Sequence, residues 1–346
     1  MTNSISVLIL KSIFMKLSFL YYIPLLLFVS CGSTKQRTCD LSEYKVKNCR
    51  MESHLIDSIL VYPESINTLN DKLIIMEPQR KDSLVSIFSC DNFEYVCSSI
   101  SKGHAKYEMV SLRNDYFSNT DSSFFVLSRN IIKEFLLKKD TIQFVNEHII
   151  KIPDALNHVL RVGRDVYITS GFTDGKGNEH LLYKDGHYSG FGDYAAPALK
   201  GNDNFFFNSS ISAGTEGKNV IWDFHRCRDL IRCYDLQGKL LEEIRIKNTN
   251  KKRIKDEHEY CYYKIKWNSS YIAVMYNNSE IGIDGFYELD NEQRPREMQI
   301  WTWDGILKQR LTFDIPIDNY CISEEGILYA IISNKPNVIY TYKLDY

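Results

Sequence analysis

The stretch Lys72-Leu73-Ile74-Ile75-Met76 is a short apolar run preceded by a polar turn, and the same arrangement occurs five more times along the chain. Equivalent positions in successive runs lie 42 to 56 residues apart, with a mean separation of 51. The six runs are Lys72–Met76, Ser123–Leu127, Asp165–Ile168, Asn219–Trp222, Tyr271–Met275 and Ile327–Ile331. A period of about 50 residues, with several short strands in each unit, is typical of the blades of a β-propeller.

A second apolar segment and a turn follow each of the first five runs. The turn residues are Asp91-Asn92, Lys139-Asp140, Asp185-Gly186, Gln237-Gly238 and Asp304-Gly305. Asp, Asn and Gly tolerate the positive φ that tight hairpin turns require, so these pairs predict a hairpin in each unit. The sixth unit, residues 338–342, reaches the C-terminus without an outer strand of its own.

The repeat predicts an all-β fold, a six-bladed β-propeller closed by an N-terminal strand. One blade cannot bury both of its faces, but neighbouring blades stacked in a ring can. Residues 54–63 are the expected donor of the missing outer strand, because such strand exchange hides two exposed sheet edges. Residues 130–138 could be read as a helix, but the flanking strands favour a further strand. A pair of β-sandwiches with coincidental spacing is the alternative fold.

The composition is that of a globular protein with a large core. Of the 346 residues, 44% are apolar and 25% are charged, and both values are ordinary for a folded domain. Aromatic residues make up 13% of the chain, which favours strands. The net charge of −2 provides no basic surface, so we do not expect nucleic acid as a partner.

The N-terminus carries the signals of export. Residues 17–29 form an apolar run that is shorter than the roughly 20 residues of a membrane-spanning helix and suits a signal peptide. The run leads into Ser30-Cys31-Gly32-Ser33, which resembles the lipobox of bacterial lipoproteins, where a small residue precedes an acylated cysteine. An ordinary secretory signal with a chance cysteine is the alternative interpretation.

These signals divide the chain into three predicted segments. They are a signal peptide over residues 1–30, a lipidated polar tether over 31–50 and the six-bladed propeller over 51–346. Met15 is an alternative start, because Met15-Lys16 stands directly before the apolar run. No acidic run follows Cys31, which favours a periplasm-facing position in a bacterial envelope, anchored at the outer membrane.

The lipobox-like segment and the blade repeat together make the chain resemble the TolB-like six-bladed β-propeller lipoproteins of Gram-negative envelopes. The resemblance covers roughly residues 50–346 and rests on Cys31, on the blade pattern and on three local phrases. The phrases are Tyr234-Asp235-Leu236-Gln237-Gly238-Lys239-Leu240, Trp303-Asp304-Gly305 and Gly192-Asp193-Tyr194. Residues 102–109 occupy the place of a Gly-x-Gly-Pro phrase of the family, without the second Gly or the Pro. The resemblance implies a fold and no enzymatic activity.

Nine cysteines are present, and lipidation of Cys31 would leave eight. Disulfides are permitted in an exported chain, and Cys90 with Cys97 or Cys39 with Cys49 are two candidate pairs whose connectivity the sequence leaves open. His225-x-Cys227 together with Cys233 superficially suggests a metal site, but a fourth ligand at sensible spacing is missing. We therefore expect no cofactor and no metal.

No catalytic motif stands out. Residues 173–179 have alternating oxygen donors, as in a calcium loop, but lack the downstream glutamate, so a hairpin turn explains them better. Polar residues near expected inner-strand ends could approach the propeller axis, and they are the candidate channel or binding-face residues. They are Glu77, Asp223, His225, Asn277 and Asn278.

We therefore expect a monomeric, membrane-tethered propeller that binds a protein, peptide or glycan on the face where loops converge, without catalysis. The alternative is a metal-dependent enzyme of the lactonase or hydrolase type, with carboxylate and amide groups around a divalent cation in the channel. Converging carboxylates within metal distance would favour the enzyme, and an apolar or blocked channel would favour binding.

Overall fold

Strands dominate the computed structural model, which describes residues 34–57, 60–150, 158–170, 178–194, 208–248, 260–290, 293–294 and 297–345. The helical segments are short: the 3-10 turn η1 (Leu41–Glu43) has three residues and the helix α3 (Ile283–Glu288) has six. None of the helices in these ranges has the length and apolar character needed to cross a lipid bilayer.

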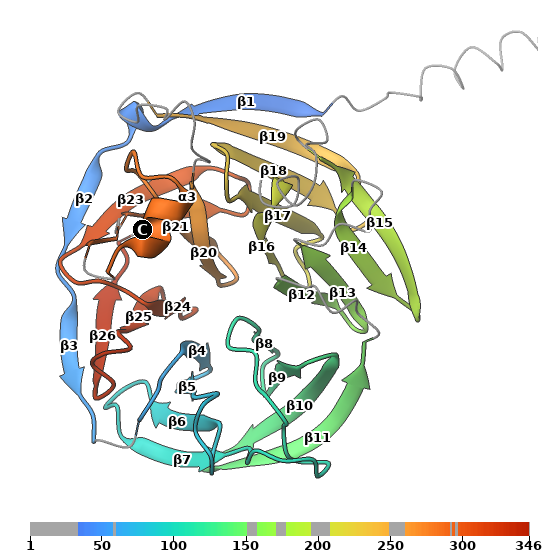
Figure 1. Cartoon of the computed structure of the whole chain (residues 1–346), viewed down its shortest axis with the longest axis vertical. Helices are drawn as coiled ribbons and strands as arrows, with labels where there is room; N and C mark the ends of the chain where they lie inside the picture. Colours follow the sequence, from blue (N-terminus) through green and yellow to red (C-terminus); the bar gives the residue numbers. More distant parts are fainter. Residues whose placement is uncertain are drawn as a thin grey trace, which may run out of the picture. The chain divides into compact units, whose positions relative to one another are not determined.

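The strands form six sheets around a common axis, numbered here in chain order (Figure 1). Sheets 1 to 3 are antiparallel meanders in which the strand nearest the axis comes first. Sheet 1 contains β4 (Ser65–Leu69), β5 (Lys72–Met76), β6 (Val85–Ser89) and β7 (Tyr95–Ser99). Sheet 2 contains β8 (Ser118–Asn119), β9 (Ser123–Ser128), β10 (Ile131–Lys138) and β11 (Thr141–Ile149). Sheet 3 contains β12 (His158–Gly163), β13 (Val166–Ser170), β14 (Asn178–Lys184) and β15 (His187–Asp193).

Sheets 4 to 6 each take one strand from the N-terminal side of the chain on their outer edge. Sheet 4 contains β16 (Ser210–Gly214), β17 (Val220–His225), β18 (Leu230–Asp235), β19 (Leu240–Lys247) and then β1 (Lys35–Asp40). Sheet 5 contains β20 (Tyr262–Trp267), β21 (Tyr271–Tyr276), β22 (Glu297–Thr302), β23 (Leu307–Phe313) and then β2 (Val46–Cys49). Sheet 6 contains β24 (Asn319–Ile322), β25 (Ile327–Ile331), β26 (Val338–Lys343) and then β3 (Glu52–Leu55).

The N-terminal strands change the predicted boundary between tether and propeller. The strand β3 is antiparallel to β26 and supplies the fourth strand of sheet 6. It overlaps the predicted donor 54–63 only at His54 and Leu55. Within the predicted tether 31–50, β1 and β2 pair with sheets 4 and 5, and the compact unit begins at Gln36 rather than at residue 51. The remaining part of that tether, through residue 33, and the signal peptide lie outside the described residues.

The core consists of one apolar cluster at each junction between neighbouring sheets. In β5, Leu73 and Ile75 pack toward sheet 6, whereas Ile74 and Met76 pack toward sheet 2. Successive side chains of a strand point to opposite faces, so a strand buried on both faces needs a continuous apolar run. This explains why the six repeated runs of the sequence are the second strands of the six sheets.

Local turn chemistry also follows the sequence. Asp185 and Gly186 connect β14 to β15 with φ values of 51° and 80°, and Lys184 pairs with His187 across the turn. A two-residue hairpin loop with positive φ at both positions matches the twist of the flanking strands. The segment 130–138 contains β10, as the flanking strands indicated.

Neither candidate disulfide forms, because Cys39, Cys49, Cys90 and Cys97 are free thiols in the described residues. Cys39 lies in β1 on sheet 4 and Cys49 lies in β2 on sheet 5, so different sheets separate them. Cys97 pairs in register with Ile87, and Cys90 lies beyond the end of β6. The short sequence spacings therefore do not place either pair face to face.

Candidate functional site

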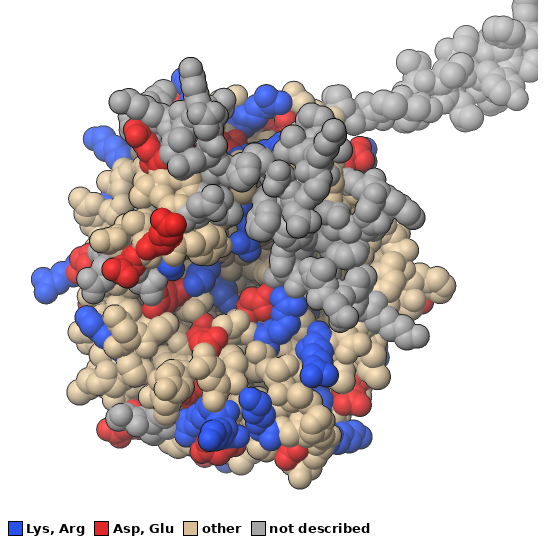
Figure 2. Space-filling view, viewed as in Figure 1, with Lys and Arg blue, Asp and Glu red and all other residues tan. Residues whose placement is uncertain are grey.

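A cavity of about 90 Å³ lies on the propeller axis. The innermost strands of all six sheets, β4, β8, β12, β16, β20 and β24, contribute to its wall. Its polar and charged lining residues include Asn67, Asp115, His158, Arg161, Lys266 and Glu324. Charged side chains of both signs gather near the middle of the face shown in Figure 2. The axis of this propeller is therefore polar and partly open.

Lys266 differs from the other charged residues of the cavity wall. Arg161 forms an ion pair with Glu216 and Asp115 forms one with Arg113. Both carboxylate oxygens of Glu324 accept from the backbone N–H of Ser269. The Lys266 ammonium donates to the amide oxygen of Asn67 at 2.9 Å, and no ion pair of Lys266 occurs in the described chain. Burial lowers the pKa of Lys266, although Cys321 and Asp115 oppose the shift.

His158 lies on the same wall and is held as a neutral ring. Its Nε2 lies 3.0 Å from the carbonyl oxygen of Ser212, which can only accept, so Nε2 carries the proton. Burial lowers the pKa of His158 to about 4 despite the nearby Asp115 carboxylate. Lys266 is therefore the residue of this wall that can offer unused charge to a ligand.

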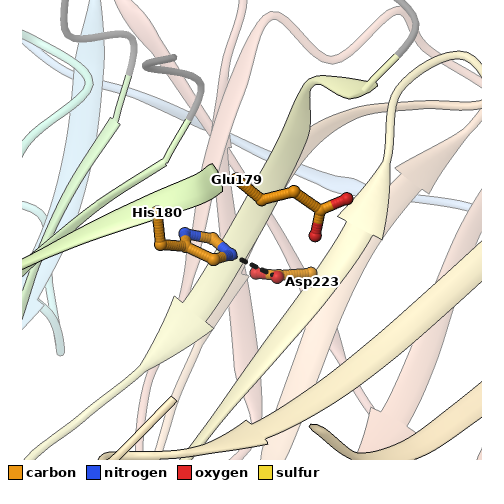
Figure 3. A group of neighbouring side chains, drawn as sticks. All are labelled: Glu179, His180 and Asp223. Atoms are coloured by element: carbon orange, nitrogen blue, oxygen red, sulfur yellow. Dashed lines mark hydrogen bonds and ion pairs between the residues drawn. The ribbon is translucent and has the colours of Figure 1, made fainter. Parts of the chain in front are cut away.

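A second polar group lies between sheets 3 and 4 (Figure 3). Glu179 and His180 belong to β14, and Asp223 belongs to β17. One ligand atom from each of the three lies within 4.8 Å of the others. The exposed fraction is 3% for Glu179 and 0% for His180 and Asp223. We call these three residues, together with His225 of β17, the intersheet cluster.

The His180 ring joins a backbone carbonyl to a carboxylate. Its Nδ1 lies 3.2 Å from the Thr169 carbonyl oxygen, and its Nε2 lies 2.5 Å from Asp223 Oδ2. In Figure 3 the imidazole points at this carboxylate. Burial alone would lower the pKa of His180 and raise that of Asp223, but their mutual attraction outweighs it. The pKa of His180 is therefore raised and that of Asp223 is lowered.

Glu179 is held by the next strand of sheet 4. Arg232 Nη1 lies 3.3 Å from Glu179 Oε1, and the Tyr234 hydroxyl donates to Oε2 at 3.0 Å. Arg232 also contacts Glu243 at 3.2 Å, so two carboxylates share its charge. Burial raises the pKa of Glu179 to about 7, in spite of the attraction of Arg232.

His225 completes the cluster without a hydrogen bond among the described residues. The side chain is fully buried, and its Nε2 lies 3.8 Å from Glu179 Oε1, beyond hydrogen-bond distance. Burial lowers the pKa of His225 to about 3, and Arg232 adds to this effect. A buried polar group without a partner costs free energy, so a hydrogen-bond partner or an ion beside this imidazole would stabilise the fold.

Gly192 lets β15 lie close to the side chains of the intersheet cluster. Gly192 of β15 has φ +77°, and a Cβ at this position would meet the Tyr234 hydroxyl at 3.3 Å and Glu179 Cβ and His180 Cδ2 at 3.4 Å. A left-handed backbone and such close neighbours suit glycine. The phrase Gly192-Asp193-Tyr194 of the sequence therefore has a packing reason.

The structure separates the residues predicted for the channel, none of which belongs to the wall of the axial cavity. Asp223 and His225 lie in the intersheet cluster. Glu77 follows β5 and accepts from Val61 N at 2.7 Å and from Ser86 Oγ at 3.0 Å, which ties a loop to sheet 1.

Asn277 and Asn278 follow β21 and make local contacts. The Asn277 amide donates to the Ile281 carbonyl at 2.9 Å, and Asn278 donates to Glu297 Oε2 at 2.9 Å. All these positions lie within or directly after second strands, whereas the first strand of each sheet lines the axis. Sequence reasoning therefore missed Lys266, Glu179 and His180. For Glu179 and His180 the sequence offered one signal, a glutamate and a histidine side by side at the end of the calcium-like segment 173–179.

One family model matches part of the sequence. Residues 43–204 match the family model described as TolB-like 6-blade propeller-like. The chain is a six-bladed β-propeller, and these residues resemble the TolB-like family. No protein with a curated description matches it by sequence.

Solved structures share the fold of this propeller. A duf4221 family member from Bacteroides vulgatus ATCC 8482 is 10% identical, with a TM-score of 0.56 over 86% of this chain and 96% of that chain. A "putative exported protein" from Bacteroides fragilis NCTC 9343 is 10% identical, with a TM-score of 0.53 over 90% and 100%. Virginiamycin B lyase from Staphylococcus aureus is 12% identical, with a TM-score of 0.50 over 85% and 99%. At these identities the likeness concerns the fold alone.

Proposed function

We propose that this propeller is an exported, lipid-anchored binding protein whose axial cavity receives an anionic group of a peptide or glycan, without catalysis. The observation that carries this proposal is Lys266, a cation in the cavity wall with one hydrogen bond and no carboxylate partner in the described chain. An ammonium has three donors, so two remain for a ligand. Removing a charge from water is costly unless a counter-charge compensates it.

The size of the cavity limits what enters it. A volume of about 90 Å³ holds a few water molecules or one small group such as a carboxylate. The rest of the ligand would lie on the face where the loops converge, as is usual for sites built on rigid scaffolds. A terminal or side-chain carboxylate of a peptide, or an acidic sugar, has this shape.

Export and anchoring rest on the N-terminal sequence. The apolar run at 17–29 and the lipobox-like Ser30-Cys31 support a signal peptide followed by an acylated cysteine. One structural neighbour is described as exported, and residues 43–204 resemble the TolB-like family, which supports a location in the bacterial envelope. We propose a monomer anchored at Cys31 to the outer membrane and facing the periplasm.

An enzyme of the lactonase or hydrolase type is the alternative. It would need carboxylate and amide groups converging around a metal in the channel. In the described residues, the group of carboxylates and histidines with metal-ligand spacing is the intersheet cluster, which is sealed from solvent and separate from the cavity wall. This placement favours binding over catalysis at the axis.

Calorimetric titration of the mature chain with acetylated tripeptides tests the binding proposal. Tripeptides with a free C-terminal carboxylate should bind, whereas the matched C-terminal amides should not. Lys266→Met should lose at least about tenfold in affinity, because a charge-assisted hydrogen bond contributes roughly 1.5–3 kcal/mol. Uronic-acid oligosaccharides serve as the second probe. Equal binding by wild type and Lys266→Met, or turnover of any probe, would overturn the proposal.

Metabolic labelling with palmitate tests the anchor separately. The wild-type chain should incorporate the label and fractionate with membranes, because more than one acyl chain makes anchoring stable. Cys31→Ala should lose the label and appear in the soluble fraction. Membrane retention of Cys31→Ala without label would show that another element holds the protein.

A further inference from the structure

We propose that Glu179, His180, Asp223 and His225 form a buried site for a divalent cation of the zinc class, which links sheets 3 and 4. This inference is independent of the axial cavity, because none of the four residues belongs to the cavity wall. It departs from the sequence analysis, which expected no metal.

The donors already lie at metal-binding distances from one another. Ligand atoms of Glu179, His180 and Asp223 lie within 4.8 Å of each other, and His225 Nε2 lies 3.8 Å from Glu179 Oε1. Zinc binds nitrogen and oxygen at about 2.0–2.2 Å, which places tetrahedral ligands roughly 3.3 Å apart. Small rotations of side chains would therefore bring the four donors to one ion.

The His180 ring is oriented as metal-binding histidines are. The Thr169 carbonyl can only accept, so Nδ1 carries a proton and the neutral ring turns the Nε2 lone pair toward Asp223. A backbone carbonyl on the other ring nitrogen is the usual outer support of a ligating histidine. The Nε2 and Asp223 Oδ2 atoms, 2.5 Å apart, then need a proton or a cation between them.

The buried imidazole of His225 supports the cation site independently of His180. Its side chain is fully buried, and neither ring nitrogen has a hydrogen-bond partner in the described ranges. The ring also lies beside Glu179 without bonding to it. An ion held by all four residues would give this imidazole the partner that it lacks.

The surrounding charges fit an anionic ligand set. Arg232 divides its charge between Glu179 and Glu243, and Arg228 also attracts Glu179. No lysine or arginine forms an ion pair with Asp223 in the described part of the chain, where its partner is the His180 ring. Arg232 and Tyr234 also fix the Glu179 carboxylate, as hydrogen bonds to ligating carboxylates commonly do.

The donor types select the class of ion. Imidazole nitrogens suit zinc and its transition-metal neighbours, whereas calcium and magnesium prefer sites made of oxygen alone. Two histidines with two carboxylates therefore favour zinc. The full burial of the site leaves no access for a substrate, so the ion would act in stability, as closed structural sites do.

Zinc titration of the chelator-treated mature chain, produced without a histidine tag, tests this site. Metal analysis and calorimetry should find one zinc per chain, and zinc should raise the unfolding temperature. Asp223→Asn and His225→Gln should each weaken zinc binding at least about 100-fold, since even outer supports cost 10–100-fold. Cobalt should give a spectrum without thiolate absorption, which excludes binding by the cysteines.

Glu297→Gln is the matched control. It removes a buried carboxylate from the Glu297–Arg310 pair in sheet 5, where Arg310 Nε lies 2.7 Å from Glu297 Oε1. This variant should lose stability but keep its zinc. Lys266→Met should also keep its zinc, so failure of this site is distinguishable from failure of the proposed function. A wild-type chain that binds no zinc, or a His225→Gln chain that binds it normally, would overturn the inference.

Discussion

The axial cavity and the intersheet cluster are two polar sites of opposite kind. The first strands of all six sheets line the cavity, which has a volume of about 90 Å³. Its wall contains the Lys266 ammonium, which has one hydrogen bond and no carboxylate partner in the described chain. The intersheet cluster takes residues from β14 and β17 and is closed to solvent. In this propeller, polar groups on the axis line an accessible cavity, whereas the polar groups of the intersheet cluster are buried.

This difference has a physical origin. Neighbouring sheets pack face to face, so polar groups between them must satisfy one another or hold an ion. First strands meet only around the axis, where water and ligands can compete for them. Substitutions in the two sites should therefore change different properties of the protein.

Removal of a charge from the intersheet cluster should have the largest effect. In the presence of a chelator, Asp223→Ala should lower the free energy of unfolding by roughly 3–5 kcal/mol, because it leaves His180 buried without its partner. Urea denaturation measures this loss. The exposed pair Lys47–Asp345 is the control, and Asp345→Ala should cost far less than Asp223→Ala, because solvent screens exposed ion pairs. Equal losses in both variants would show that the cluster contributes nothing special.

The next effect concerns pH and Lys264, which lies two residues before Lys266 in β20. Its ammonium donates to the Asp318 carbonyl, and burial lowers its pKa from the ordinary 10.5 of a lysine to about 8. The unfolded chain then binds more protons between these two pH values, so wild-type stability should rise with pH through this window.

Denaturation of wild type and Lys264→Met between pH 7 and 11 checks this effect. Relative to the variant, the wild type should gain at most about 3 kcal/mol as the pH rises from about 8 toward 10.5, at about 1.36 kcal/mol per unit of pKa. Parallel stability curves would mean that Lys264 keeps its ordinary pKa.

A smaller effect isolates the crowding around the intersheet cluster. Gly192 and Gly186 both have positive φ, but a Cβ at Gly186 meets nothing within 4 Å. Each change to alanine should cost about 1 kcal/mol or more in backbone strain. Gly192→Ala should cost about 1 kcal/mol more than Gly186→Ala, since it also crowds Glu179 and His180. Thermal unfolding of the two variants gives the difference, and identical values would contradict the packing described for Gly192.

The repeat could be predicted from the sequence because it is an apolar signal. Each second strand is buried on both faces, so residues such as Leu73 and Ile74 form an unbroken run. The strand β1 escaped prediction for the opposite reason. It is a short outer strand whose residues, such as Arg37, pair with polar groups at a sheet edge. Such residues read as a solvated tether.

The site could be predicted only in part. Asp223 and His225 were identified as candidates, but their partners Glu179 and His180 come from another sheet, more than 40 residues away. Sheet-to-sheet contacts leave no period in the sequence. The cavity wall was missed because first strands, such as β20, carry mixed patterns in which Lys266 looks like any exposed lysine.

The separation of binding from stability is tested most directly by the free energy of unfolding of Lys266→Met. We propose that this lysine serves a ligand, and its burial disfavours the charged form. We predict that the ligand-free variant unfolds with a free energy within about 1 kcal/mol of wild type, or above it, because an apolar side chain avoids desolvation of the ammonium. A loss of roughly 2 kcal/mol or more would show that Lys266 supports the ring itself, and it would contradict an open site kept for a ligand.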